Sequence, residues 1–228
     1  MRKLELRIED IDLFNGLKSI EINDIKKYIQ IKRFEKGDLL FREGNACQNI
    51  FIVKSGRVKL FSISKDGKEQ ILDILEPGDN CACHPAIENW CCGSIGEVMI
   101  ESVLWIISRK HFSDLLQQKH LVALKLSSIL ANRLKDYASM LEKISLEDVE
   151  QRLVRYLLKQ AQRKGMTCSN GIFFNLTLTR SELASFIGSA RETIIRNLYN
   201  LQKKELISIH NSYITVLDVK GMEAILKT

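Results

Sequence analysis

A stretch near the C-terminus, LTRSELASFIGSARETIIRNL, constrains the fold more than any other part of the chain. A hydroxyl residue precedes a glutamate by three positions twice, as Thr179 with Glu182 and as Ser189 with Glu192. This spacing is the capping box, in which the hydroxyl and the carboxylate accept hydrogen bonds from backbone amides at a helix start. Because Gly188 separates the two boxes, the stretch predicts two short helices joined by a turn, a helix-turn-helix.

The second of these helices is expected to pack on the first with one face and to expose the other. Apolar residues recur at helical spacing, namely Ala184, Ile187, Ile194, Leu198 and Leu201. The polar face suits the DNA major groove, because Arg can donate two hydrogen bonds to guanine and Glu can accept one from cytosine N4. The alternative is that Glu192 only caps its helix and the arginines are solvated. The candidate DNA-binding residues are Arg191, Glu192, Arg196, Thr179, Ser189 and Thr193.

Positive charge is concentrated in the last third of the chain. Residues 151–228 hold 12 Lys/Arg against 5 Asp/Glu, a net charge of +7, so residues 1–150 carry −1 of the total of +6. Lys and Arg contacts to phosphates give affinity for DNA by releasing counterions. A basic C-terminal module beside a nearly neutral N-terminal one is therefore typical of a regulator with a separate sensing domain.

Two strand-like segments follow the helix-turn-helix. Residues 206–209 and 213–217 are rich in β-branched residues and flank His210, Asn211 and Ser212, which favour a turn. A strand-turn-strand in this place would form a wing against the helices. The C-terminal module is therefore predicted to be a winged helix-turn-helix.

The pattern from about residue 30 to residue 108 is that of β-structure. Strand-like runs at 51–53, 58–63, 71–75 and 103–107 are separated by turn residues at about ten-residue spacing. The spacing leaves no room for helices between strands, so a sandwich or barrel is favoured over a parallel doubly wound sheet. With a length of 228 residues, two domains are expected.

A helical pattern begins near Ser113. It carries a stripe with spacings of three and four residues, formed by Leu126, Leu130, Leu134, Tyr137, Leu141 and Ile144. The stripe could lie on the β-domain, which is the more common arrangement of an amphipathic helix. Its length also suits a two-stranded coiled coil, which would place two DNA-reading helices on one duplex.

The cellular compartment follows from what the sequence contains. No apolar run is long enough to span a bilayer, and the N-terminal residues MRKLELR do not form a secretion signal. We therefore expect a cytoplasmic protein without membrane contact. Six cysteines in a reducing compartment favour metal binding or redox chemistry over structural disulfides. No Ser/His/Asp or paired-carboxylate arrangement can be assembled from local spacing, so we do not expect an enzyme.

Taken in order, the motifs GDLLFREG (37–44), IVKSG (52–56), DGKE (66–69), PGD (77–79) and GSARET (188–193) resemble the Crp/Fnr family of bacterial transcription regulators. The resemblance covers nearly the whole chain. It implies an α+β fold with a jelly-roll-like cyclic-nucleotide-binding β-roll (1–112), a dimerisation helix (113–146) and a winged helix-turn-helix (147–228). It also implies a homodimer on double-stranded DNA, at a palindromic operator with TGTGA-like half-sites, and RNA polymerase as a further partner.

The chain departs from relatives of the cyclic-AMP receptor in the phosphate-binding cassette. Those relatives carry Gly-Glu and, about ten residues later, Arg-Ser or Arg-Thr, where this chain has Ala82-Cys83 and Cys92-Gly93. Without the arginine no bidentate cation is available for a phosphodiester. The sequence therefore argues against cyclic AMP as the effector.

The same cassette concentrates four cysteines and a histidine within twelve residues. Thiolates with an imidazole suit zinc, an iron-sulfur cluster or haem, and two neighbouring thiols suffice for a metal-free switch. By resemblance to carbon monoxide sensors of the family, His84 stands at their histidine position but Ala82 replaces their cysteine. The alternatives are that the cysteines are small buried side chains, and that a cyclic nucleotide or another small molecule is the effector. The expected sensor residues are Cys81, Cys83, His84, Cys91 and Cys92, with Cys47 left open.

Overall fold

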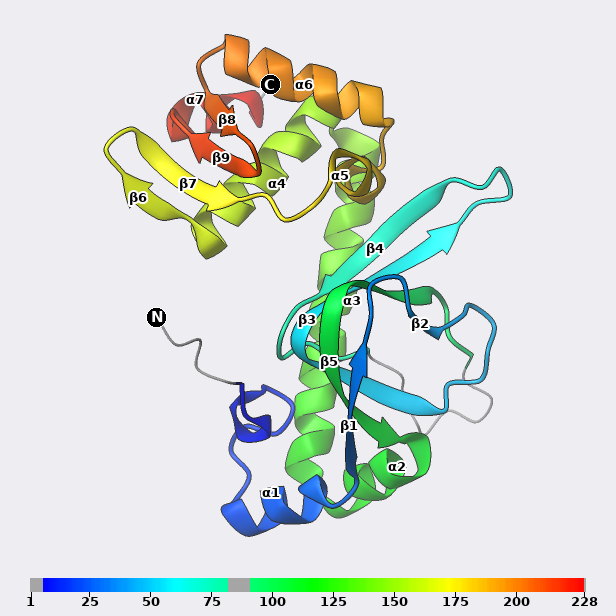
Figure 1. Cartoon of the computed structure of the whole chain (residues 1–228). Coiled ribbons are helices and arrows are strands. Elements are labelled where there is room, and N and C mark those ends of the chain that lie inside the picture. Colours follow the sequence, from blue (N-terminus) through cyan, green and yellow to red (C-terminus); the bar gives the residue numbers. More distant parts are fainter. Residues whose placement is uncertain (1–5, 82–90, 228) are drawn as a thin grey trace. The chain divides into compact units, whose positions relative to one another are not determined.

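The computed structural model describes residues 6–81 and 91–227, except for the side chains of residues 140, 141 and 143–146. The chain divides into two compact units, Met1–Asp136 and Tyr137–Thr228, and helix α3 (His120–Leu146) contributes to both (Figure 1). An antiparallel sheet dominates the first unit, and helices dominate the second. The α+β class expected from the sequence is therefore confirmed. Within the described residues, no helix is long and apolar enough to cross a bilayer.

The first unit is built on a five-stranded sheet whose strands are all antiparallel to their neighbours. Its elements in chain order are η1 (Ile8–Asp10), α1 (Ser19–Lys26), β1 (Ile29–Phe34), β2 (Leu39–Phe41), β3 (Asn49–Ile63), β4 (Glu69–Leu75), β5 (Ile95–Ser108) and α2 (Arg109–Gln118). Strands β1, β2 and β3 all pair with β5, and β4 pairs with the second half of β3. The antiparallel arrangement agrees with the expected roll.

Strands β3 and β5 are covered on both faces, because their side chains alternate between two apolar clusters. One cluster joins Ile52 and Ile107 to the helices, including Phe112 of α2 and Leu126 of α3. The other cluster joins Val53 and Leu104 on the opposite face, and it also contains Cys81. Strands buried on both sides explain the nearly continuous apolar runs in this part of the sequence.

Strand β3 bends at Gly56, where two separate strands were expected from the sequence. Its register with β5 shifts three times between Val53 and Val58. Gly56 has φ +96°, and a Cβ atom there would lie 2.6 Å from the Cα of Ser102. Ser102 is 1% exposed, and its hydroxyl accepts a hydrogen bond from the Arg57 amide at 3.0 Å. A glycine is required here because the two strands approach more closely than any side chain permits.

The continuous helix expected from Ser113 is in fact two helices. Helix α2 begins after Ser108, whose hydroxyl accepts a hydrogen bond from the His111 amide at 3.3 Å, and its last residue is Gln118. Lys119 is not helical, and its ammonium pairs with Glu21 of α1 at 3.2 Å. The break allows Phe112 of α2 and Leu126 of α3 to enter the same core cluster.

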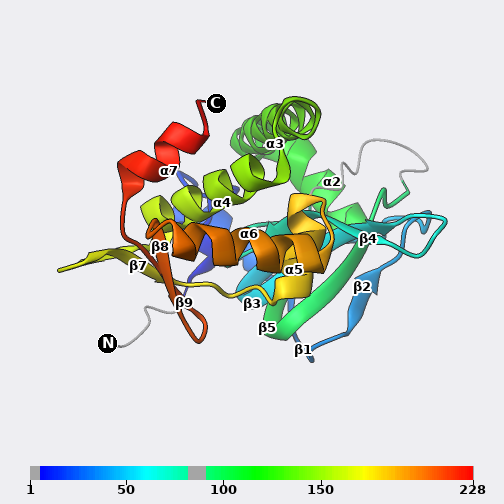
Figure 2. The ribbon, with the colours of Figure 1, turned by 90° about the horizontal axis from the view of Figure 1, so that it is seen from above.

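In the second unit, helices and a small sheet pack around an apolar core. After the end of α3 it comprises α4 (Val149–Lys164), β6 (Met166–Cys168), β7 (Gly171–Asn175), α5 (Arg180–Ile187), α6 (Arg191–Lys203), β8 (Ile207–His210), β9 (Tyr213–Val216) and α7 (Val219–Ile225). Helix α4 packs against α5, α6 and α7, and Figure 2 shows α4 and α6 side by side. The predicted helix-turn-helix is confirmed as α5 and α6.

The wing is larger than the sequence indicates. The predicted pair β8 and β9 joins β6 and β7 in a four-stranded antiparallel sheet with the order β6-β7-β9-β8. Cys168 ends β6 and pairs with Gly171. The short β6 and β7 escaped sequence analysis because three- to five-residue strands carry little periodicity.

The close approach at Gly56 predicts a large loss of stability for Gly56→Ala. The new methyl group would overlap the backbone of Ser102 in addition to straining a positive φ, so we expect about 2 to 5 kcal/mol less free energy of unfolding. Gly67→Ala is the matched control, because Gly67 has φ +76° and open space around its Cα, and it should lose about 1 to 2 kcal/mol. Urea unfolding followed by tryptophan fluorescence measures both, and equal losses would contradict the packing argument.

Candidate nucleic-acid interface and sensor segment

The first helix of the motif is capped as its sequence predicts. The Thr179 hydroxyl accepts from the Glu182 amide at 3.2 Å, and the Glu182 carboxylate accepts from the Thr179 amide at 2.7 Å. Two of the amides that a helix start leaves without partners are thereby satisfied. Thr179 itself is exposed at this start.

The turn between the helices corrects the second predicted capping box. Gly188 is left-handed, with φ 75°, and the amides of Gly188 and Ser189 both donate to the Ala184 carbonyl at 2.9 Å. This bond makes Ser189 part of the end of α5. Helix α6 consequently begins only at Arg191, its N-cap is Ala190, and no side chain caps it. The expected Ser189 cap with Glu192 is therefore wrong.

Helix α6 has one buried and one exposed face. Ile194, Leu198 and Leu201 are buried within the unit. The side exposed to solvent carries the predicted reading residues Arg191, Glu192 and Arg196, whereas Thr193 is half-buried. Two large apolar residues that the sequence analysis did not single out are exposed among them, Ile195 and Tyr199. This face presents hydrogen-bond donors, an acceptor and apolar surface together.

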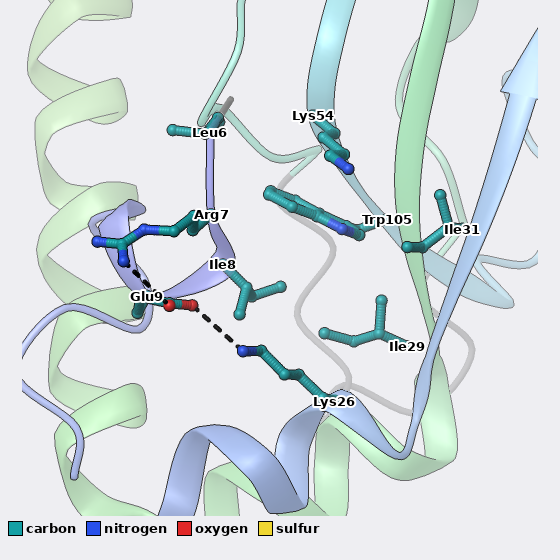
Figure 3. Close-up of a pocket in the computed structure, with 9 residues that line it drawn as sticks. All are labelled: Leu6, Arg7, Ile8, Glu9, Lys26, Ile29, Ile31, Lys54 and Trp105. Carbon is teal, nitrogen blue, oxygen red and sulfur yellow. Dashed lines mark ion pairs between the residues drawn. The ribbon is translucent and has the colours of Figure 1, made fainter. Parts of the chain in front are cut away.

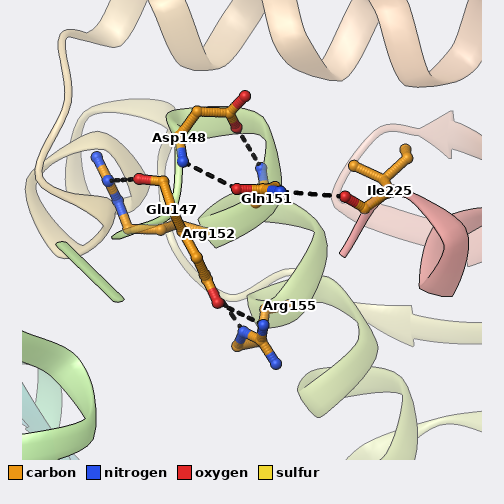
Figure 4. A network of polar contacts seen from close by, with 6 residues as sticks. All are labelled: Glu147, Asp148, Gln151, Arg152, Arg155 and Ile225. Carbon is orange, nitrogen blue, oxygen red and sulfur yellow. Dashed lines mark hydrogen bonds and ion pairs between the residues drawn. The ribbon is translucent and has the colours of Figure 1, made fainter. Parts of the chain in front are cut away.

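Arg152 of α4 contacts the turn between α5 and α6, and Figure 4 shows its other contact, with Glu147. Its Nε donates to the carbonyl of Ile187 at the end of α5 at 3.1 Å. Its second nitrogen donates to the carbonyl of Glu147, just before α4, at 2.6 Å. The Glu147 carboxylate in turn accepts hydrogen bonds from Arg155. One guanidinium thus joins the start of α4 to the turn that precedes the reading helix. No local sequence pattern indicates this contact, because its partners are 35 residues apart.

The start of α4 is anchored a second time. The Asp148 carboxylate accepts from the Gln151 amide at 2.8 Å, and the Gln151 side chain accepts from the Asp148 amide at 3.0 Å. Gln151 also donates to the carbonyl of Ile225 in α7 at 3.3 Å (Figure 4). The end of α5, the start of α4 and the C-terminal helix α7 are therefore linked by polar contacts within one unit.

The predicted sensor segment, which runs from Cys81 to Cys92, begins at a buried cysteine in the first unit. The Cys81 sulfur accepts from the Phe51 amide at 3.1 Å, and the Cys81 amide donates to the Phe51 carbonyl at 2.9 Å. Burial raises the pKa of Cys81 to about 11, because the apolar surroundings disfavour a thiolate. Cys92 lies near enough to contribute to this rise. Cys81 is therefore a neutral thiol at neutral pH.

The segment's other end is attached to the loop before β3. The Cys92 amide donates to the Asn45 carbonyl at 2.9 Å, and Cys91 bridges to Ala46. Cys91 is exposed, whereas Cys92 is buried and burial raises its pKa. Cys47 takes part in a disulfide bond, so its sulfur is not a thiolate ligand. Both described ends of the segment are thus fixed by backbone hydrogen bonds.

The described residues alone do not form a metal site. No group of three His, Cys, Asp or Glu residues gathers among them. Cys83 and His84, two of the five predicted sensor residues, lie outside the described ranges. Cys81, Cys91 and Cys92 by themselves are therefore not arranged as a ligand set.

Arg133 connects the segment to helix α3. Its guanidinium donates to the carbonyl of Asn80, next to Cys81, and lies 4.0 Å from the Asp73 carboxylate of β4. Its positive charge also lowers the pKa of Cys81, although burial outweighs this effect. No local sequence pattern predicts this contact, because Arg133 and Asn80 are 53 positions apart.

A pocket of ≈ 510 Å³ lies elsewhere in the first unit, beside Trp105 (Figure 3). Its lining is formed by Leu6, Arg7, Ile8, Glu9, Lys26, Ile29, Ile31, Lys54 and Trp105. Glu9 pairs with Lys26 at 3.5 Å and with Arg7 at 3.8 Å. Among the described residues, no cysteine lines this pocket.

Two family models match the chain in the order of its two units. The cyclic nucleotide-binding domain matches residues 31–119, and the Crp-like helix-turn-helix domain matches residues 151–225. The first match covers the sheet and α2, and the second covers the reading helix and the wing.

Three known proteins are similar to this chain in sequence over most of their length. The anaerobic regulatory protein of Pasteurella multocida is 27% identical over 203 residues, 89% of this chain and 74% of that protein. The fumarate and nitrate reduction regulatory protein of Vibrio cholerae is 27% identical over 203 residues, 89% of this chain and 81% of that protein. The cyclic AMP receptor protein of Thermus thermophilus is 27% identical over 213 residues, 93% of this chain and 95% of that protein.

Solved structures agree on the fold. A CooA mutant from Carboxydothermus hydrogenoformans has a TM-score of 0.82 and 22% identity, covering 97% of this chain and 99% of that one. The c-di-GMP responsive regulator CLP of Xanthomonas campestris has a TM-score of 0.74 and 22% identity, covering 89% of this chain and 100% of that one. With its sensor-type sheet, its helix-turn-helix and these relatives, the chain belongs to the Crp/Fnr family of DNA-binding transcription regulators, which are not enzymes.

Proposed function

We propose that this regulator is a cytoplasmic homodimer that reads a palindromic operator and is gated by its cysteine segment. The observation that carries the proposal is the exposed face of α6, on which Arg191, Glu192 and Arg196 stand free of the unit's core. Two such faces, one from each protomer, would read half-sites like TGTGA about one helical turn apart. RNA polymerase is the further partner that such a regulator would engage.

The dimer proposal rests on an exposed line along α3. Residues at alternating spacings of three and four are exposed, and they are Leu124, Ser127, Ala131, Leu134 and Ala138. Leu134 is 70% exposed and Leu124 is 52% exposed, which leaves apolar surface for a partner helix. The line differs from the stripe expected from the sequence, because Leu126 is buried in the first unit. Small residues between the leucines allow two helices to approach closely.

The gating proposal rests on where the cysteine segment is attached. Asn80, the residue before Cys81, accepts a hydrogen bond from Arg133 of α3, within the proposed dimer helix. Chemistry that draws Cys81, Cys83, His84, Cys91 and Cys92 together would pull on this contact. Such a switch requires only a different affinity of the effector for the two states of the protein, worth a few kcal/mol. The occupant, whether zinc, iron-sulfur cluster, haem or no metal at all, is left to experiment.

A second candidate is gating by a nucleotide or another small molecule, with structural cysteines. The observation in its favour is the burial of Cys81 and Cys92, which suits packing as well as sensing. One relative is named a cyclic AMP receptor protein. The same experiment separates the two candidates, as described below.

Arg191→Ala should weaken operator binding and relax one base position. Loss of a bidentate contact to guanine costs about 1 to 3 kcal/mol of discrimination. An unbiased binding selection with wild type and variant measures both effects. Arg42→Ala, which removes an exposed arginine in the first unit, is the control and should leave the selected sequence unchanged. A wild-type selection without a two-fold-symmetric site would contradict the proposed function.

Leu134→Glu should separate the protomers. Burial of a leucine on each side contributes about 1.5 to 3 kcal/mol, and a carboxylate facing its copy adds repulsion. Sedimentation at micromolar concentration is the measurement, with Asn132→Glu as the control for the added charge, since Asn132 is exposed but off the line. A wild type that sediments as a monomer would refute the dimer.

Replacing both Cys81 and Cys83 by serine should make operator binding independent of oxidation and of metal removal. Wild type and variant are compared in anaerobic, oxidised and metal-chelated conditions, with Cys168→Ser in the second unit as the control. We expect the wild type and the control to change affinity between conditions and the double variant not to. If all three proteins bind equally throughout, and cyclic AMP tightens binding, the cysteines are structural and the second candidate holds.

A further inference from the structure

The exposed face of α6, which carries Arg191, Glu192 and Arg196, also has an exposed isoleucine in its middle. Ile195 is 42% exposed, whereas its neighbour Ile194 is 0% exposed and belongs to the core of the unit. Arg191 precedes Ile195 by one helical turn on the same side of α6, and Tyr199, 64% exposed, follows it by one turn. The exposed apolar surface thus continues the line of the reading arginine.

Single exposed apolar residues are ordinary on protein surfaces, but this one is flanked by Arg191, Glu192 and Arg196. Each of those side chains can form hydrogen bonds with base edges, whereas the isoleucine side chain has neither donor nor acceptor. The major groove offers one apolar group for it to contact, the C5-methyl group of thymine. We infer that Ile195 makes this protein prefer thymine at one position of each half-site, by contact with that methyl group.

The inference rests on the proposed function and adds a specificity residue to it. Four residues along a helix correspond to about 6 Å, and stacked base pairs are about 3.4 Å apart. Where α6 follows the groove, the thymine would lie about two base pairs from the base that Arg191 reads. Cytosine at that position would place the groove-facing hydrogen of its N4 amino group against an apolar side chain that has no acceptor for it. Cytosine is therefore disfavoured further.

The experiment uses the operator that an unbiased selection returns with the full-length wild type. Each thymine of the half-site is replaced in turn by deoxyuridine, which removes only the methyl group. At one position we expect binding by the wild type to weaken about fourfold per half-site, the effect of one buried methyl group. With Ile195→Ala the same replacement should have no effect. Ile20→Ala, an exposed isoleucine of the first unit, should keep the wild-type response.

Two results would overturn the inference. One is a wild type indifferent to deoxyuridine at every thymine of the half-site, or a half-site without thymine. The other is an Ile195→Ala variant that responds as strongly as the wild type, with its helical circular dichroism unchanged. A selection that returns no specific sequence contradicts the proposed function instead, so the two failures are distinguishable. Ile195→Val, which keeps most of the apolar contact, should retain the response and serves as the conservative variant.

Discussion

Two hydrogen bonds of the Arg152 guanidinium join the turn before α6 to the start of α4. The end of a helix leaves carbonyl groups without backbone donors, and in α5 the next two amides, those of Gly188 and Ser189, both bond to Ala184. Arg152 supplies the missing donor to Ile187 and bonds Glu147 at the same time. The start of α4 and the turn before α6 are therefore held by the same side chain.

In the first unit, the burial of Cys81 limits the chemistry that is possible at the sensor segment. A pKa of about 11 for Cys81 makes its thiolate about 3 kcal/mol less favourable than that of a free thiol. Thiol exchange proceeds through the thiolate, so Cys81 is a slow partner in a simple redox switch while it stays buried. Exposed Cys91 is the accessible sulfur of the described segment. An effector acting at Cys81 therefore has to bind strongly enough to offset this burial, or to move the segment.

The sequence analysis succeeded where the deciding interaction is local. The cap of Thr179 with Glu182 spans three residues, and the turn of β8 and β9 spans two, so their residue types predict them directly. Prediction failed where two local patterns compete for the same residue, and where the interaction is distant in sequence. Ser189 resembles a cap, but its amide bonds back to Ala184 and delays the start of α6. The break at Lys119 likewise depends on a core shared by α2 and α3.

The sequence by itself determined the order of the two units, the helix-turn-helix and the concentration of positive charge beside it. These features depend on periodicity, capping and residue type within short stretches. Only the tertiary structure decided that Gly56 is the point where β3 and β5 nearly touch, that Leu126 faces inward while Leu134 faces outward, and that Arg133 reaches Asn80. Burial and contacts between residues dozens of positions apart arise when distant segments pack together, and no local pattern encodes which of them will meet.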